Sequence, residues 1–212
     1  MKRTRRFSKL ELVLLIVVGS ACISAVVWLD TPSSARSGPA ATSSATAQQR
    51  KDAIARAAFT EAYKVFQHPR CMNCHPDGNL PLQFDDSVPH AQRVQRGPEG
   101  KGIYGMKCSA CHQLTNLPGE HMPPGTPNWH LPPPEMPMVF QNRTPGQLAR
   151  QLKDPKQNGG KTLEELLHHV SSDPLVLWGW NPGEGRSTPP LSHAEFVSKM
   201  EEWIKNGAAD PK

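Results

Sequence analysis

The chain has 212 residues and a formal net charge of +5. Most of that excess charge lies in residues 1–44, which hold six of the 24 Lys and Arg residues and two of the 19 Asp and Glu residues. The rest of the chain is nearly neutral, so no basic surface argues for a nucleic-acid partner. The 22 prolines predict a domain rich in loops, with only a small apolar core of its own.

Residues 1–30 are interpreted as a secretory signal sequence or an N-terminal membrane anchor. Basic residues fill Met1–Arg6, and the uncharged run from Leu12 to Leu29 is long enough to cross a bilayer. Basic flanks stay on the cytoplasmic side, so the chain after Asp30 is expected on the periplasmic side of the inner membrane. Whether it is anchored there or released by cleavage is left open.

Residues 31–47 are mostly Ser, Ala, Thr, Gly and Pro, and we predict a flexible tether there because such residues bury no core. The folded domain is expected over residues 48–212. Its first helix is predicted over Gln48–Phe66 and stops before Pro69. Apolar residues recur in this helix at four-residue spacing: Ile54, Ala58, Ala62 and Phe66.

Capping patterns predict three further helices. Thr144-Pro145 opens one that runs to about Lys153, and Thr162 with Glu165 opens one through Val170. Ser192 with Glu195 opens the last helix, which ends near Gly207. That helix has three large apolar residues on one face: Phe196, Met200 and Trp203. No alternating strand pattern is present, so the predicted fold class is mainly α with long loops.

Two five-residue segments share one pattern, Cys71-Met72-Asn73-Cys74-His75 and Cys108-Ser109-Ala110-Cys111-His112. Cys-x-x-Cys-His is the attachment motif of c-type haem. The two thiols of each motif add to the vinyl groups of one porphyrin, and the adjacent histidine supplies an axial nitrogen to the iron. The sequence therefore predicts two covalently bound haem c groups.

Three other interpretations of the four cysteines compete with haem attachment. A thioredoxin-like redox pair expects a strand followed by a helix and does not require histidine. A zinc site or a pair of disulfides would use the cysteines but leave the repeated histidine unexplained. Two complete motifs behind an export segment favour haem over all three.

The chain resembles a class I c-type cytochrome at its ends, where one helix leads into Cys71 and a C-terminal helix is expected to pack across it. The resemblance implies class I helices around the haems. The segments Val94–Gln113, Pro123-Pro124-Gly125, Trp129 and Trp178-Gly179-Trp180 resemble, more closely, small two-haem proteins often labelled as an isoquinoline 1-oxidoreductase subunit. That resemblance implies a role in receiving electrons from a molybdenum hydroxylase.

The connection Pro76–Lys107 is too short for a complete class I domain around the first haem, so both haems are expected to share one compact unit. Candidate sixth ligands lie in loops. Met136 is preferred over Met122 opposite His112, because both methionines sit on proline-stiffened segments but Met122 is only ten residues away. Opposite His75 the preferred candidate is His90. Met106 is the main alternative, and His169 is a third candidate.

The expected function is electron transfer between a periplasmic or membrane-bound dehydrogenase and a downstream redox protein, with no bond chemistry at the irons. One alternative is a haem enzyme, such as a two-haem peroxidase, in which one iron keeps an open axial site. A second alternative is a membrane-tethered sensor, but a sensor would need a signalling domain, and the short segment expected in the cytoplasm cannot hold one.

Overall fold

The computed structural model describes residues 39–212, and these belong to one compact unit. The expected signal sequence or anchor, residues 1–30, lies outside the described residues. Among the helices that are described, none combines the length and the hydropathy needed to cross a membrane.

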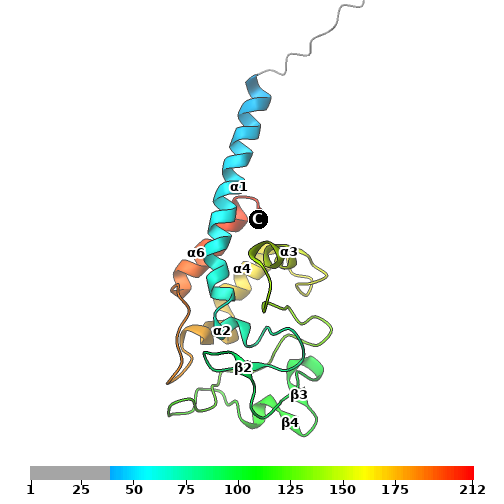
Figure 1. Ribbon diagram of the computed structural model, residues 1–212, viewed down its shortest axis with the longest axis vertical. Coiled ribbons are helices and arrows are strands. Elements are labelled where there is room, and N and C mark those ends of the chain that lie inside the picture. The colour runs from blue at the N-terminus through cyan, green and yellow to red at the C-terminus, as the bar shows by residue number, and fades with distance from the viewer. Residues whose placement is uncertain (1–38) are drawn as a thin grey trace, which may run out of the picture. The chain divides into compact units, whose positions relative to one another are not determined.

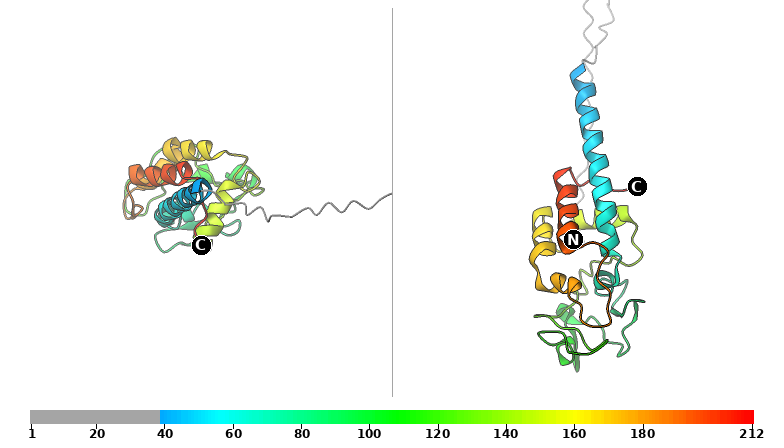
Figure 2. Two further views of the ribbon diagram at one scale, coloured as in Figure 1. Left: turned by 90° about the horizontal axis from the view of Figure 1, so that it is seen from above. Right: turned by 90° about the vertical axis from the view of Figure 1, so that its left-hand side faces the viewer.

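Four helices enclose the core: α1 (Pro39–Phe66), α3 (Pro145–Lys153), α4 (Leu163–Ser172) and α6 (His193–Lys205). Helix α1 contacts α6 and α3, and α4 contacts α3 and α6, so each helix has two neighbours (Figure 1). Viewed along α1, helix α6 lies close beside it (Figure 2). The prediction of a mainly α fold is confirmed.

The other elements are short. They comprise the helical turns α2 (Pro69–Met72), η1 (Pro98–Gly100), η2 (Cys108–Ala110), α5 (Pro174–Leu177) and η3 (Trp178–Trp180). Two antiparallel hairpins pair β1 (Leu82–Gln83) with β2 (Val88–Pro89) and β3 (Gly102–Ile103) with β4 (Met106–Lys107). These hairpins and their loops lie beyond the C-terminal end of α1 (Figure 1).

Aromatic side chains join α1 to α6 in the core. The ring centroids of Phe59 and Trp203 are 4.7 Å apart, and those of Phe66 and Phe196 are 5.2 Å apart. Offset and edge-on pairs of this kind add to the energy of apolar burial. Phe196, Met200 and Trp203 are buried on one face of α6, as predicted.

The buried face of α1 differs from the predicted one at its start. Ala58, Ala62 and Phe66 are buried as expected, but Ile54 is 38 % exposed and Ala55 takes its place in the core. A helix has 3.6 residues per turn, so a strict four-residue repeat drifts off the contact face over three turns. Alanines on this face let α6 approach closely.

The three predicted caps are confirmed. Thr144, Thr162 and Ser192 each form a capping box with the residue three positions on. The start of α1 differs from the prediction. The helix begins at Pro39 rather than Gln48, so residues 39–47 of the expected tether are helical. Proline is compatible with a first helical turn, and the following segment is rich in alanine, the strongest helix former.

The loop region has little apolar core. Within the described chain, the segment 76–137 contributes no residue to the core cluster, which the four helices, Phe140 and Ala208 form. Only scattered apolar residues of this segment, such as Cys108 and Leu131, are buried. The region is therefore ordered mainly by polar contacts with the rest of the molecule.

Candidate functional site

Each Cys-x-x-Cys-His motif forms one helical turn. The Cys74 amide donates to the Cys71 carbonyl at 3.2 Å, and the Cys111 amide donates to the Cys108 carbonyl at the same distance. Residues three apart on a helical turn lie on one side of it. Each turn therefore presents two thiols on one side, with a histidine directly after the second, and all four thiols are free.

The imidazole of His75 is held on two sides. Its Nδ1 lies 2.7 Å from the Met138 carbonyl oxygen, and its ring stacks on Phe140 with centroids 3.8 Å apart and an 11° angle between planes. Burial lowers the pKa of His75 to about 3, so the ring is neutral at neutral pH. A neutral imidazole that donates through Nδ1 keeps its lone pair on Nε2.

The imidazole of His112 repeats this arrangement. Its Nδ1 lies 2.7 Å from the Pro124 carbonyl oxygen, and its ring stacks on Trp129 with centroids 4.4 Å apart and a 5° angle between planes. Burial lowers its pKa as well, although less far. Histidines that bind metals usually donate the second ring nitrogen to a carbonyl or carboxylate, so both histidines are oriented as Nε2 ligands.

The thiols of the first motif are protonated at neutral pH. Burial raises the pKa of Cys71 to about 12 and that of Cys74 to about 11, although nearby Arg70 opposes both shifts. Redox-active Cys-x-x-Cys pairs instead contain a thiolate that electropositive surroundings stabilise, and these uncharged thiols differ from it.

A cavity of about 530 Å³ borders the second motif. Its wall includes Ser109 and His112 of the motif, Trp129, and the cations Lys101 and Lys107. Its size lies within the range of cofactor pockets in proteins.

Arg96 carries a buried charge beside the first motif. It has 0 % exposed surface, and its guanidinium donates to the carbonyls of Gly78 and Pro132 at 2.9 and 2.6 Å, with a longer contact to Pro137. These partners are uncharged, and its Nε has no hydrogen-bond partner among the described residues. A buried cation is costly without an anion. A porphyrin carries propionate carboxylates, so a haem attached to Cys74 fits this charge.

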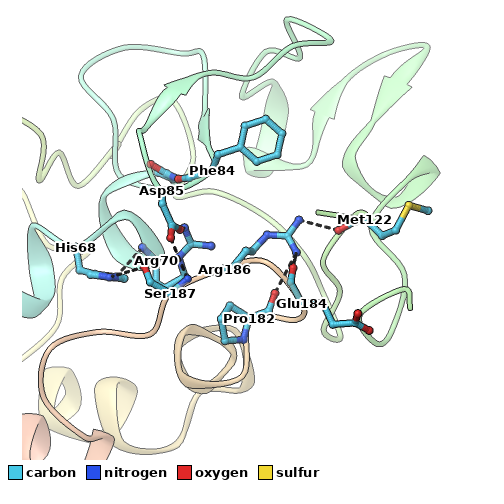
Figure 3. Close-up of polar contacts among 10 residues, drawn as sticks. His68, Arg70, Phe84, Asp85, Met122, Pro182, Glu184, Arg186 and Ser187 are labelled. Atoms are coloured by element: carbon cyan, nitrogen blue, oxygen red, sulfur yellow. Dashed lines mark hydrogen bonds and ion pairs between the residues drawn. The ribbon is translucent and has the colours of Figure 1, made fainter. Parts of the chain in front are cut away.

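An ion pair between a buried arginine and an exposed aspartate orders the chain around the first motif (Figure 3). The buried guanidinium of Arg70 pairs with Asp85, which lies beyond the motif in the β1–β2 hairpin. The same carboxylate accepts the Ser187 amide at 3.0 Å, and the Ser187 hydroxyl lies 3.2 Å from Nε2 of His68.

The segment that ends at Ser187 also contacts the loop after the second motif. Arg186 donates to the Met122 carbonyl at 2.7 Å (Figure 3), and the Gly119 amide donates to the Glu184 carboxylate at 3.2 Å. Residues 181–187 therefore tie both motif loops together. No local pattern in this Pro- and Gly-rich segment reveals that role.

The sixth-ligand candidates His90 and Met136 each lie near a residue that belongs to, or holds, the other motif. The ring of His90 lies beside His112, with centroids 6.3 Å apart, although the sequence assigns His90 to the first haem. The loop of Met136 instead approaches His75, because Met138 holds that histidine, while the thioether of Met136 lies against Gly159. Burial lowers the pKa of His90, and a hydrogen bond with the Gln92 side chain, in which the imidazole is the donor, opposes the shift.

The structure also places the three remaining candidates, Met106, Met122 and His169. Met106 and Met122 are 41 % and 43 % exposed. Met122 also lies on the loop whose Pro124 carbonyl binds Nδ1 of His112, which is the side away from Nε2. His169 pairs with Asp173 and is near enough to His75 to lower its pKa.

Several residues of the site are missed by sequence reasoning. Arg96 and Phe140 have no motif around them, since their roles depend on chain segments that only the fold brings together. The ring of Trp129 stacks on His112. Trp178 packs edge-on against Trp129 with centroids 4.9 Å apart.

Across residues 39–212, no group of three or more His, Cys, Asp or Glu side chains is placed to hold a metal ion, so the described part contains no candidate zinc site. Comparison with known proteins found no family model, no curated protein and no solved structure that matches this chain.

Proposed function

We propose that this chain is a two-haem c-type cytochrome that carries electrons on the periplasmic side of the inner membrane. The observation that carries the proposal is the repeated geometry of the two motifs. In both, a helical turn presents two free thiols, and the following histidine places Nδ1 2.7 Å from a backbone carbonyl and stacks on an aromatic ring. One such site is a common arrangement, and two equivalent ones in a small domain point to a shared chemistry.

Six residues hold the cofactors under this proposal: Cys71, Cys74 and His75 for the first haem, and Cys108, Cys111 and His112 for the second. A bound haem supplies an iron that gains or loses one electron reversibly. The chain fixes each imidazole by its carbonyl and its aromatic neighbour, which leaves Nε2 for the iron. Arg96 provides a positive charge near the first haem for a propionate.

The class I arrangement is part of the proposal. Helix α1 leads directly into the first motif through the short turn α2, and α6 packs along α1 at the end that approaches the motif. This is the relation of terminal helices that class I cytochromes use. The second motif lies on the loop region that follows, which agrees with one domain holding both haems.

The proposed partners are redox proteins on the same side of the membrane. A periplasmic or membrane-bound dehydrogenase gives electrons, and an oxidase or another cytochrome receives them. The resemblance to proteins labelled as an isoquinoline 1-oxidoreductase subunit favours a molybdenum hydroxylase as the donor. The chain itself performs no bond chemistry in this role.

Mass spectrometry of the exported protein tests the cofactor. The chain is produced with a working c-type cytochrome maturation system, and the covalently bound haem is counted from the mass and from the pyridine haemochrome spectrum. The unaltered chain is expected to carry two haems, and the double variants Cys71→Ala/Cys74→Ala and Cys108→Ala/Cys111→Ala one each. The matched control Cys22→Ala keeps both. A bare polypeptide mass for the unaltered chain would sink the proposal.

Ligand binding separates a carrier from a haem enzyme. Carbon monoxide is added to the reduced protein and cyanide to the oxidised protein, and binding is followed in the Soret band. A carrier with both axial positions filled resists both ligands. Rapid, stoichiometric binding at one haem, together with turnover of hydrogen peroxide, would instead identify the peroxidase-like alternative.

A further inference from the structure

The backbone around His90 fixes where its side chain lies. His90 directly follows β2 of the first hairpin, and its amide donates to the Pro81 carbonyl at 2.9 Å. Its own carbonyl accepts the Arg93 amide at 2.8 Å. The hairpin brings His90 back beside Pro81, next to Leu82, whose amide donates to the Asn73 carbonyl of the first motif at 3.0 Å. From this position the ring of His90 lies near that of His112 in the second motif.

The two imidazoles are separated by the spacing of a shared iron. The ring centroids of His90 and His112 are 6.3 Å apart, and the planes make an angle of 63°. A metal–imidazole bond is about 2.0 Å long and a ring centroid lies about 1.1 Å behind its nitrogen, so two imidazoles on opposite sides of one metal have centroids roughly 6 Å apart. The observed separation matches the length that a central iron requires, and it also lies within the range of edge-on ring pairs, so the experiment below must distinguish the two.

The contacts of His112 with Pro124 and Trp129 involve its Nδ1 and a face of its ring, and not its Nε2. Trp129 covers one face of the His112 ring, and the Pro124 carbonyl occupies its Nδ1. The Nδ1 of His90 is shielded from solvent and has no hydrogen-bond partner among residues 39–212. His90 therefore has one buried ring nitrogen, Nδ1, for which residues 39–212 offer no hydrogen-bond partner, and a metal bound at that atom would satisfy it.

We propose that His90 is the second axial ligand of the haem held by Cys108, Cys111 and His112. This inference rests on the proposed function, since it presumes that a haem is attached at that motif. The iron then lies between two imidazoles, which gives it a lower reduction potential than a histidine–methionine iron. It also closes that iron to exogenous ligands.

The test uses the full-length, matured protein and three variants. His90→Ala removes the ligand, His90→Met replaces it with a thioether, and His168→Ala is the control, since His168 is an exposed histidine on α4. Each protein is measured by covalent haem count, by electron paramagnetic resonance and near-infrared magnetic circular dichroism of the ferric form, by carbon monoxide uptake of the ferrous form, and by redox titration.

The unaltered protein is expected to show one iron per chain with two nitrogen axial ligands. In His90→Ala, half of the iron becomes high-spin and the reduced protein takes up one carbon monoxide per chain, and added imidazole restores the low-spin signal. In His90→Met, the potential of one haem rises while that of the other is unchanged. The control behaves as the unaltered protein.

Two results would overturn the assignment while leaving the proposed function intact. One is a two-haem His90→Ala variant whose spectra and carbon monoxide uptake match those of the unaltered protein. The other is an unaltered protein in which neither iron has two nitrogen ligands, and this measurement decides the matter even when the variants fail to accumulate. An unaltered protein with no covalent haem would instead refute the proposed function itself.

Discussion

Single side chains in this protein join segments that the sequence keeps far apart. Arg96 shows this most clearly, because one guanidinium binds Gly78 after the first motif and Pro132 in the loop that holds His75. The Arg96 carbonyl accepts the Gly102 amide at 2.9 Å, which continues the connection towards the second motif. A residue in that position controls the geometry of both motif loops.

Replacing Arg96 with methionine is expected to lower the free energy of unfolding by about 3 kcal/mol, because hydrogen bonds to a charged donor are each worth about 1.5–3 kcal/mol. Urea unfolding followed by circular dichroism measures the loss. Arg93→Met is the matched control, since Arg93 lies three residues earlier and is exposed. Equal stability of the two variants would show that the Arg96 contacts contribute nothing.

Acid is expected to weaken the fold from about pH 6.5 downward. The pKa of His75 falls from its ordinary 6.5 to about 3 in the folded chain because the ring is buried, and His112 shifts in the same direction. Between these values the unfolded chain binds a proton that the folded chain excludes, so stability decreases as the pH falls, by at most about 1.4 kcal/mol per pH unit for His75. An iron bound to Nε2 would also exclude the proton, so the stability of the haem-loaded protein is likewise expected to decrease as the pH falls.

Urea unfolding at a series of pH values between about 7 and 4 measures this effect. The decrease is expected to begin above the range in which carboxylates such as Asp85 and Glu195 take up protons. A free energy of unfolding that stays constant down to about pH 5 would contradict the assigned protonation of these histidines.

Among the elements, the glycine-rich turn before the second motif is the most constrained. Gly100 has φ 70°, and a Cβ there would lie 1.7 Å from the Leu131 carbonyl oxygen. The Gly100 carbonyl in turn accepts the Leu131 amide at 2.9 Å. This close backbone contact fastens η1 and the following β3–β4 hairpin to the proline-rich loop.

Gly100→Ala is therefore expected to loosen the second motif much more than Gly105→Ala does. Gly105 has φ 82° and nothing within 4 Å of its added Cβ, so this control carries the same backbone strain, about 1 kcal/mol, without the collision. Thermal unfolding and the haem count of both variants give the comparison. A Gly100→Ala protein as stable as the control would mean that the Leu131 contact is dispensable.

The helices could be predicted from the sequence and the arrangement of the loops could not. Caps such as Thr144 and Ser192 act within four residues, so local pattern suffices to place the helices they begin. The two Cys-x-x-Cys-His motifs can also be recognised from the sequence, because each is a local pattern of five residues. The position of His90, in contrast, depends on a hairpin of two-residue strands and on Arg96, and neither leaves a periodic signal.

At the scale of the whole molecule, the described chain has a helical part with an apolar core and a loop part without one. All members of the core cluster lie outside residues 76–137. Apolar burial supplies most of the free energy of folding, so the helical part is expected to be stable by itself while the loop part depends on its cofactors.

Hydrogen–deuterium exchange checks this division. In the Cys108→Ala/Cys111→Ala variant, amides of residues 97–130 are expected to exchange much faster than in the unaltered protein. Those of α1 and α6 should keep their protection, since their contacts with each other do not involve the second motif. Uniform loss of protection over the whole chain would show instead that the two parts unfold as one unit.

The nearness of the two motifs also sets what one encounter with a partner can accomplish. Arg96 joins the loops around both motifs, because its guanidinium binds Gly78 and Pro132 and its carbonyl accepts the Gly102 amide. Under the proposed function, two irons held in one small domain are expected to exchange an electron internally before a partner dissociates. A donor enzyme that takes two electrons from its substrate can then pass both to this protein in one encounter. Its cofactor need not remain in a one-electron radical state until a second acceptor arrives.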